Sequence, residues 1–249
     1  MSAVRKLVAG NWKMHGLSAQ LAEAEAIAHS LAKTPAAARV AICPPAVLIH
    51  RMTERLAGTS VLVGAQDIHA HERGAHTGDQ SGEMLHDAGA TMVIIGHSER
   101  RAAYAEPCAQ VAAKARAALK AGLEPILCLG ETREERDAGA AIEVVTRQLR
   151  DSLPDALEGQ AFAVAYEPVW AIGSGATPTL AEIEEVHRAL RQGLVSRFSN
   201  GAVIPILYGG SVKPSNAVEI LHAAEVGGAL VGGASLKAED FLPIIRAAG

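Results

Sequence analysis

Eight short apolar runs, separated by longer stretches of helical period, constrain the fold of this chain more than any other feature. The runs are bounded by Gly or Pro and are apolar almost throughout, which is typical of parallel strands buried on both faces. They lie near residues 6–11, 39–43, 60–65, 91–96, 124–129, 162–167, 203–208 and 228–232. Strands that alternate with helices predict βα units, and eight such units in about 250 residues are what a closed (β/α)₈ barrel requires.

The chain is therefore expected to be an α/β protein with a single domain over residues 1–249. No linker, low-complexity segment or block of like charges interrupts the series of units. A doubly wound open sheet is the alternative architecture. Such a sheet usually carries a glycine-rich dinucleotide-binding turn after its first strand, and G-N-W-K at 10–13 lacks one.

Three local patterns make sharper predictions about the helices. Thr179 and Glu182 match a capping box, which predicts a helix start near residue 180 and leaves 168–178 as a loop. The charged run at 131–137 is most simply the solvated start of another helix. The first helix should bury an apolar stripe at spacings of three and four residues, formed by Leu17, Leu21, Ala24, Ala28 and Leu31.

Composition and charge exclude several classes of protein. The net charge is -4 and aromatic residues make up 3% of the chain, so a nucleic-acid partner is not expected. No apolar run approaches the roughly 18 residues of a membrane helix, and the N-terminus lacks a signal-peptide pattern. The three cysteines, Cys43, Cys108 and Cys128, form no close pair. We therefore expect a soluble, cytoplasmic protein without a disulfide framework and without membrane attachment.

Polar residues follow several predicted strands, at the end of the barrel where this fold places active sites. They are Asn11, Lys13, His97, Glu99, Glu167, and the sequences Y-G-G-S at 208–211 and V-G-G-A-S at 231–235. Lys13 is either an ordinary surface lysine or a point charge for a phosphate and a developing oxyanion. Glu99 either orients Lys13 or forms an ion pair with Arg100 or Arg101.

His97 and Glu167 are the two candidates for proton chemistry. A lone histidine is more often structural than catalytic, but a helix N-terminus after His97 would disfavour the imidazolium and leave a neutral ring able to donate to a carbonyl. Glu167 lies between Tyr166 and Pro168, where an apolar wall would raise its pKa toward the range of a general base. For Glu167 taken alone, a structural ion pair is an equally good interpretation.

Two glycine pairs at successive strand ends favour a phosphate site. Together with I-G-S-G at 172–175, they let backbone N–H groups approach a ligand closely. Neither a Walker sequence nor metal-ligand spacing such as H-E-x-x-H occurs, so no cofactor or metal is expected. A carboxylate, a neutral imidazole, an ammonium group and a phosphate site suit proton abstraction beside the carbonyl of a small phosphorylated sugar, as in an aldose-ketose isomerase.

The same motifs carry a resemblance to a known family. The chain contains, in this order, A-G-N-W-K-M, C-P-P, G-A-H-T-G, I-I-G-H-S-E-R-R, C-L-G-E, A-Y-E-P-V-W-A-I-G-S-G, Y-G-G-S-V and L-V-G-G-A-S-L. Through these motifs, which span nearly its full length, it closely resembles the triosephosphate isomerase family. The resemblance implies a cofactor-independent interconversion of dihydroxyacetone phosphate and D-glyceraldehyde 3-phosphate through an enediolate, in glycolysis and gluconeogenesis.

The resemblance also implies roles for individual residues. Glu167 is expected to shuttle the proton between C1 and C2, His97 to polarise the carbonyl, and Lys13 and Asn11 to stabilise the enediolate. The loop at 168–178 is expected to act as a lid over the phosphate. The implied phosphate-binding positions are Gly173, Ser211, Gly232 and Gly233.

Members of the family are usually homodimers, which implies a second copy of this chain as partner. The long third loop is expected to insert into that copy and to bring Thr77 close to the partner's Lys13 and the partner's Asn11. Four positions depart from the common pattern of the family. His15 and Asp67 replace Asn near the expected dimer contact, and Ser174 and Ala176 replace a frequent Thr and a common Lys in the lid.

Two other functions remain as alternatives. An isomerase of a larger sugar phosphate would share the glycine pairs but need not combine Lys13, His97 and Glu167. A non-catalytic phosphosugar-binding barrel would be marked by loss of one of these residues, and none is missing.

Overall fold

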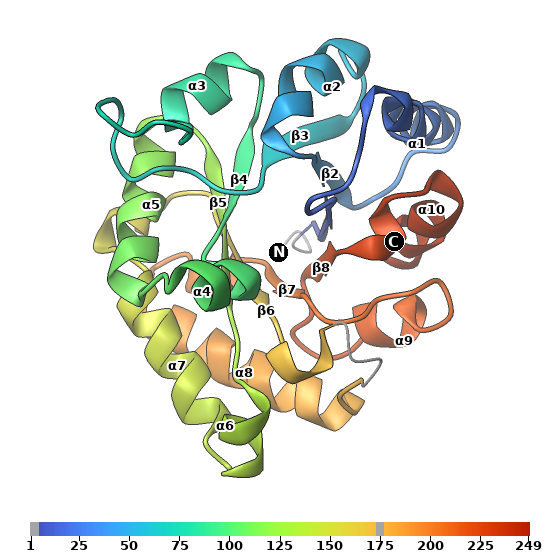
Figure 1. Cartoon of the computed structure of the whole chain (residues 1–249). Helices are drawn as coiled ribbons and strands as arrows, with labels where there is room; N and C mark the ends of the chain where they lie inside the picture. Colours follow the sequence, from blue (N-terminus) through green and yellow to red (C-terminus); the bar gives the residue numbers. More distant parts are fainter. Residues whose placement is uncertain (1–4, 173–176) are drawn as a thin grey trace.

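The computed structural model describes residues 5–172 and 177–249, and its parallel strands close into a barrel in sequence order (Figure 1). The strands are β1 Leu7–Asn11, β2 Arg39–Cys43, β3 Val61–Ala65, β4 Met92–Ile95, β5 Glu124–Leu129, β6 Ala163–Tyr166, β7 Ile206–Tyr208 and β8 Gly228–Val231. Strand β1 pairs with both β2 and β8, which closes the ring. The predicted (β/α)₈ barrel is confirmed, and the alternative of an open sheet is wrong.

Helices surround the barrel on its outside (Figure 1). They are α1 Leu21–Lys33, α2 Ile49–Arg55, α3 Gly82–Asp87, α4 Ser98–Tyr104, α5 Cys108–Lys120, α6 Arg133–Asp137, α7 Ala141–Ser152, α8 Leu180–Arg197, α9 Ala217–Leu221 and α10 Ala238–Ala247. Within the described part of the chain, no helix combines the length and the apolar character needed to cross a membrane.

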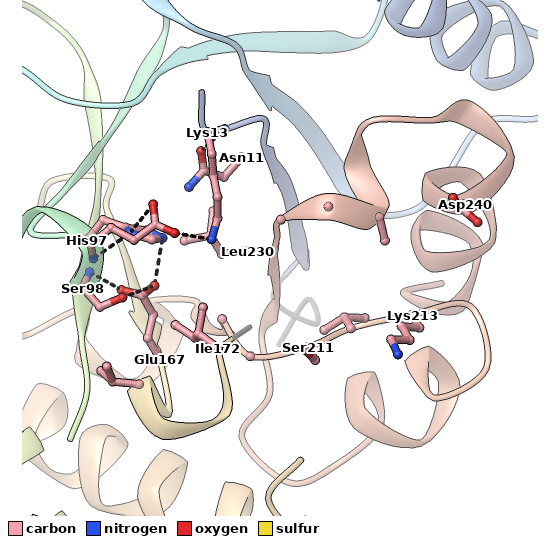
Figure 2. Close-up of a pocket in the computed structure, with 18 of the residues that line it drawn as sticks. Asn11, Lys13, His97, Ser98, Glu167, Ile172, Ser211, Lys213, Leu230 and Asp240 are labelled. Atoms are coloured by element: carbon pink, nitrogen blue, oxygen red, sulfur yellow. Dashed lines mark hydrogen bonds and ion pairs between the residues drawn. The ribbon is translucent and has the colours of Figure 1, made fainter. Parts of the chain in front are cut away.

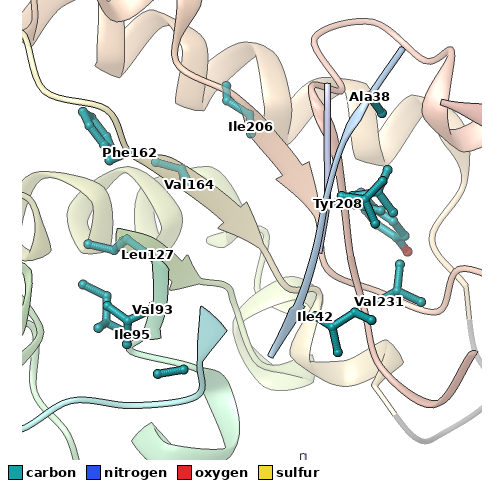
Figure 3. Packing of buried hydrophobic residues seen from close by; sticks show 14 of the residues in the cluster. Ala38, Ile42, Val93, Ile95, Leu127, Phe162, Val164, Ile206, Tyr208 and Val231 are labelled. Carbon is teal, nitrogen blue, oxygen red and sulfur yellow. The ribbon is translucent and has the colours of Figure 1, made fainter. Parts of the chain in front are cut away.

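Within each nearly continuous apolar run, successive side chains alternate between two buried layers. In β1, Leu7 and Ala9 belong to a cluster made of strand side chains, whereas Val8 between them belongs to a larger cluster shared with the helices. The first cluster fills the barrel, and Figure 3 shows strand side chains of the second. Both layers exclude water, so neither face of a strand requires polar residues. The filled barrel leaves its C-terminal rim as the place for a site.

The structure corrects two details of the predicted elements. Leu17 is not part of the buried stripe, because it precedes α1 and is 74% exposed, and Ile27 takes its place among the buried residues of the helix. The seventh run does not form a strand from residue 203, because 201–203 adopt a 3₁₀ turn and β7 begins at Ile206. Pro205 lacks the N–H that would extend the ladder on its side.

The predicted start of α8 is confirmed in detail. The Thr179 hydroxyl accepts a hydrogen bond from the Glu182 N–H at 3.3 Å, and the Glu182 carboxylate accepts one from the Thr179 N–H at 2.7 Å. Two N–H groups that the helix cannot pair internally are satisfied in this way. The same cap fixes where the loop after β6 ends.

We expect Thr179→Ala to lower the free energy of unfolding by about 1 kcal/mol, because the first turn of α8 loses its side-chain acceptor. Urea denaturation at one fixed protein concentration measures the change. Thr34→Ala, at an exposed threonine after α1, is the matched control and should stay within about 0.5 kcal/mol of the unsubstituted protein. Equal losses in the two variants would contradict the role of the cap.

Candidate active site

A cavity of about 950 Å³ opens at the C-terminal ends of the strands (Figure 2). The predicted site residues that line it are Asn11, Lys13, His97, Glu167, Ser211, Gly232 and Gly233. They come from β1, β4, β6, β7 and β8 or the connections that follow these strands, so the closed barrel brings together residues up to 222 positions apart. Gly173, Ser174 and Ala176, which also carried predictions, lie outside the described residues.

Glu167 directly follows β6 and is buried, with 1% of its surface exposed. Its carboxylate accepts hydrogen bonds from the Ser98 N–H at 3.0 Å and from the Ser98 hydroxyl at 3.1 Å. The carboxylate also contacts the His97 ring, whose Nε2 atom lies 2.9 Å from Glu167 Oε1. Three polar contacts therefore offset the cost of burying a charge, which would otherwise be several kcal/mol.

These contacts overturn the prediction of a raised pKa for Glu167 in the ligand-free site. Burial by itself raises the pKa of this carboxyl group, but His97 and Ser98 lower it below its ordinary value. The carboxylate is therefore ionised at neutral pH. Burial acts in the direction expected from the sequence, but its effect is outweighed by the His97 charge and by hydrogen bonds to the charged form, which favour that form.

His97 is the N-cap residue of α4, as its place between a strand and a helix predicted. Its Nδ1 atom accepts a hydrogen bond from the Glu99 N–H at 3.3 Å, so the proton of a neutral ring resides on Nε2, which faces Glu167. Burial lowers the pKa of His97, but the charge and hydrogen bond of Glu167, together with the charge of Glu99, outweigh this effect and raise it. In the ligand-free site the carboxylate thus opposes the neutral ring that the helix N-terminus was predicted to favour.

Lys13 forms an ion pair with Glu99 across the cavity, with 2.5 Å between Nζ and Oε1. This pair agrees with the interpretation that Glu99 orients Lys13, and Arg100 is paired elsewhere, with Asp67 and Glu106. Lys13 has a left-handed φ of 53°, which costs a residue other than glycine roughly 1–3 kcal/mol. The Asn11 side chain supports this turn by accepting from the Lys13 N–H at 3.0 Å.

The glycines after β7 and β8 have different reasons to be glycine. A Cβ at Gly210 would lie 2.2 Å from the Tyr208 hydroxyl, and one at Gly209 would lie 2.9 Å from Glu167 Cγ, so packing excludes side chains there. A Cβ at Gly233 would meet nothing within 4 Å. Gly233 therefore borders open space inside the cavity, which leaves its backbone accessible to a ligand.

The sequence did not reveal the importance of Ser98 or Glu131. Ser98 restrains Glu167, and its place immediately after His97 was the available signal. Glu131 was predicted to belong to a solvated run, but its side chain is fully buried and accepts from the Tyr166 hydroxyl at 3.0 Å and the Trp170 indole N–H at 2.9 Å. Helix α6 begins at Arg133, so Glu131 precedes it and turns inward to hold the start of the loop after β6.

Asp67 also occupies an inward position. Its carboxylate contacts Lys114 at 2.6 Å and Arg100 at 2.9 Å, which places it in an ion-pair network under the connection after β3. Glu106, another member of this network, is almost fully buried and pairs with both Lys114 and Arg100. The charge at position 67 therefore compensates the buried Lys114 and the half-buried Arg100 in the subunit itself.

Comparisons with known proteins agree with this geometry. A family model described as triosephosphate isomerase matches residues 6–248. The chain belongs to the triosephosphate isomerase family. Its aldose-ketose isomerase class, predicted from the motifs, is that of the family.

Similar members of the triosephosphate isomerase family come from several bacteria. The enzyme of Caulobacter vibrioides is 61% identical over 244 residues, which cover 98% of this chain and 96% of the relative. That of Rhodopseudomonas palustris is 57% identical, with 98% and 97% coverage. The crystal structure of triosephosphate isomerase from Bartonella henselae has a TM-score of 0.92 and 48% identity, and the match covers 98% of this chain and 99% of that one.

The contact between His97 and Glu167 predicts a titration that depends on the carboxylate. In the protein without substrate, we expect the pKa of His97 to lie above its ordinary value of 6.5. In Glu167→Gln we expect it to lie below 6.5, because the Glu167 charge that raises this pKa is removed while the burial that lowers it remains. The chemical shifts of the ring C–H groups, followed by NMR across pH, give both midpoints.

Glu99→Gln is the matched control for this titration. The Glu99 carboxylate also raises the pKa of His97, but its Oε2 atom lies 3.7 Å from Nδ1 and its side chain is about half exposed. Its removal should therefore lower the midpoint less than removal of Glu167. An unchanged midpoint in Glu167→Gln would contradict the assignment.

Proposed function

We propose that this chain interconverts dihydroxyacetone phosphate and D-glyceraldehyde 3-phosphate, with Glu167 as the base, His97 as the electrophile, and Lys13 and Asn11 as stabilisers of the enediolate. The observation that carries the proposal is the meeting of these four side chains, from three separate strand ends, in one cavity. Each step of the proposed reaction uses groups of the chain itself and no cofactor. The larger-sugar isomerase and the non-catalytic barrel receive no separate support from the geometry.

Glu167 is held in a resting position by His97 and Ser98, where its lowered pKa keeps it ionised but makes it a weak base. A substrate that displaces these three contacts leaves the carboxylate in the same buried surroundings. Its pKa then rises, because burial disfavours the charged form and the opposing hydrogen bonds are gone. We infer that substrate binding itself converts Glu167 into a base strong enough to remove a proton from the carbon beside the carbonyl.

His97 is proposed to donate its Nε2 proton in a hydrogen bond to the substrate carbonyl oxygen. Once Glu167 turns to the substrate, the charge that raises the pKa of His97 moves away. The backbone N–H that caps Nδ1 then favours the neutral ring. A neutral donor stabilises the developing enediolate oxygen without giving up its proton to it.

Lys13 and Asn11 complete the stabilisation of negative charge. The ammonium group of Lys13 lines the cavity and is positioned by its ion pair with Glu99. Asn11 uses its carbonyl oxygen to support the Lys13 backbone, which leaves its NH₂ group as the donor toward the substrate. Charge stabilisation by preplaced groups in a site of low dielectric is commonly the largest contribution to such a reaction.

The phosphate group is proposed to bind at the opposite side of the cavity, after β7 and β8. Ser211, Gly232 and Gly233 line this part, and the accessible backbone at Gly233 supports the assignment. A phosphate site after the last two strands recurs in (β/α)₈ barrels. Gly173 is proposed as a further phosphate contact on the resemblance alone.

We expect Glu167→Gln to lower kcat at least ~10²-fold with D-glyceraldehyde 3-phosphate, because the variant keeps the shape of the side chain but cannot accept the proton. A coupled isomerisation assay measures the rate, and circular dichroism checks the fold. Glu185→Gln, at an exposed glutamate of α8, is the control and should retain its turnover. Near-normal kcat in Glu167→Gln would rule out this base.

A homodimer is proposed as the functional assembly, joined through the loop around Thr77. Large apolar side chains are exposed on the connections after β1 and β2, namely Met14 at 95% and Val47 at 81%, and on α3, which follows the third connection, namely Met84 at 60%. Thr77 is exposed on the third of these connections. Neighbouring strands place the three connections in one sector of the rim, and large apolar side chains exposed in one sector are typical of a protein interface.

The dimer proposal predicts that Thr77→Arg shifts the protein toward a monomer, since a charge would be placed in the interface without a partner. Sedimentation velocity over a range of concentrations measures the shift. Thr34→Arg is the matched control, because Thr34 precedes β2 at the other end of the barrel. Identical sedimentation of the two variants would count against the loop as the contact.

A cytoplasmic location is proposed on the chemistry of the cysteines. Cys43, Cys108 and Cys128 are free, and the first and last are buried in the barrel. Burial raises the pKa of Cys43 to about 12. Free thiols are typical of proteins that work in a reducing compartment.

A further inference from the structure

The long connection between β3 and α3 holds three histidine rings in mutual contact. The ring centroids of His69 and His76 are 4.0 Å apart, those of His71 and His76 are 4.9 Å apart, and those of His69 and His71 are 5.1 Å apart. Each ring offers one nitrogen, and these three nitrogens lie within 4.8 Å of one another. The cluster does not line the substrate cavity and takes no part in the proposed isomerisation.

The backbone of this connection fixes the three rings. The His69 N–H donates to the Gln80 carbonyl at 2.9 Å, which joins the two arms of the connection, and the Asp79 N–H donates to the His76 carbonyl at 3.1 Å, which closes a turn within the second arm. Gly78 turns the chain with a φ of 95°, a conformation that favours glycine. Figure 1 shows the connection running along the outside of the barrel beside α3. The rings are therefore brought together by the fold of the connection.

The hydrogen bonds of the rings define the nitrogens that a cation would meet. The His69 Nδ1 atom accepts from the His71 N–H at 3.1 Å, so an ion bound to this lone pair would replace that hydrogen bond. The protonated Nε2 of the same ring lies 3.7 Å from the Asp79 carboxylate. A carboxylate behind an imidazole is a common support for a metal-binding histidine. His71 Nδ1 and His76 Nε2 are 2.9 Å apart.

We propose that His69, His71 and His76 bind a divalent transition-metal ion of the kind that imidazole prefers, such as Zn²⁺. Zinc takes nitrogen ligands at about 2.0–2.1 Å, which places two nitrogens of a tetrahedral site about 3.3 Å apart. The separations in the cluster bracket this value, and rotation of the exposed His71 ring brings the nitrogens into range. Water takes the fourth position. The ion would tie together the two arms of the connection.

Isothermal titration calorimetry of the untagged, metal-stripped full chain with Zn²⁺ alone tests the proposal. The expected result is one Zn²⁺ per chain, with a dissociation constant at least ~10-fold larger in His71→Ala. His71 is exposed, so its replacement leaves the barrel core intact, and circular dichroism verifies this. His29→Ala, at an exposed histidine of α1, is the matched control and should bind as the unsubstituted chain does.

Two further measurements keep the test independent of any single variant. Co²⁺ in place of Zn²⁺ should show the visible absorption of a nitrogen-bound ion, and His76→Gln should abolish that band. Absence of saturable binding, or equal affinity in His71→Ala and the unsubstituted chain, would overturn the proposal. One Zn²⁺ per two chains would overturn it as well, because the ion would then lie between two subunits.

Discussion

Closure of the ladder between β1 and β8 is the constraint on which the rest of the structure depends. Residues 7–10 of β1 pair with 228–231 of β8, the first and last strands of the chain. A Cβ at Gly228 would lie 1.8 Å from the Leu7 carbonyl oxygen, and the φ of Gly228 is 142°, so the seam requires glycine at this point. Without closure the two edge strands would expose unpaired backbone groups, and the strand ends would not meet around a common cavity.

The closed rim places a carboxylate and an imidazole where each sets the protonation of the other. The negative charge of Glu167 favours the protonated form of His97, and His97 in turn favours the ionised form of Glu167. Ser98 adds two hydrogen bonds to the carboxylate. The burial that makes Glu167 costly is thus balanced at rest. In the proposed reaction, this burial raises the pKa of Glu167 once a substrate takes over these contacts, so the same interaction underlies both the resting site and the proposed activation of the base.

The connection after β3 on the same rim serves surfaces outside the cavity. The connection after β3 carries Thr77 at the proposed dimer contact and the histidine cluster at His69, His71 and His76. Beneath it, Asp67 turns inward to Lys114 and Arg100. A single long connection therefore combines an internal ion-pair network with two proposed external contacts, because its ends are fixed by β3 and α3.

The sequence by itself determined the architecture and most of the site. Eight apolar runs and a capping box depend on local spacing, and local spacing is what a sequence displays directly. Asn11, Lys13, His97 and Glu167 were recognisable because residues at the ends of parallel barrel strands must converge. The motifs shared with the triosephosphate isomerase family then predicted the reaction.

Tertiary structure decided the quantities that depend on distant neighbours. The direction of the Glu167 pKa shift reversed because His97, 70 positions earlier, contributes a charge and a hydrogen bond, and Ser98 supplies two more hydrogen bonds. Glu131 proved buried because Tyr166 and Trp170 fold back to it, although its neighbours in sequence are charged. Such outcomes depend on which groups meet in space and how much water they exclude, and neither follows from the order of residues along the chain.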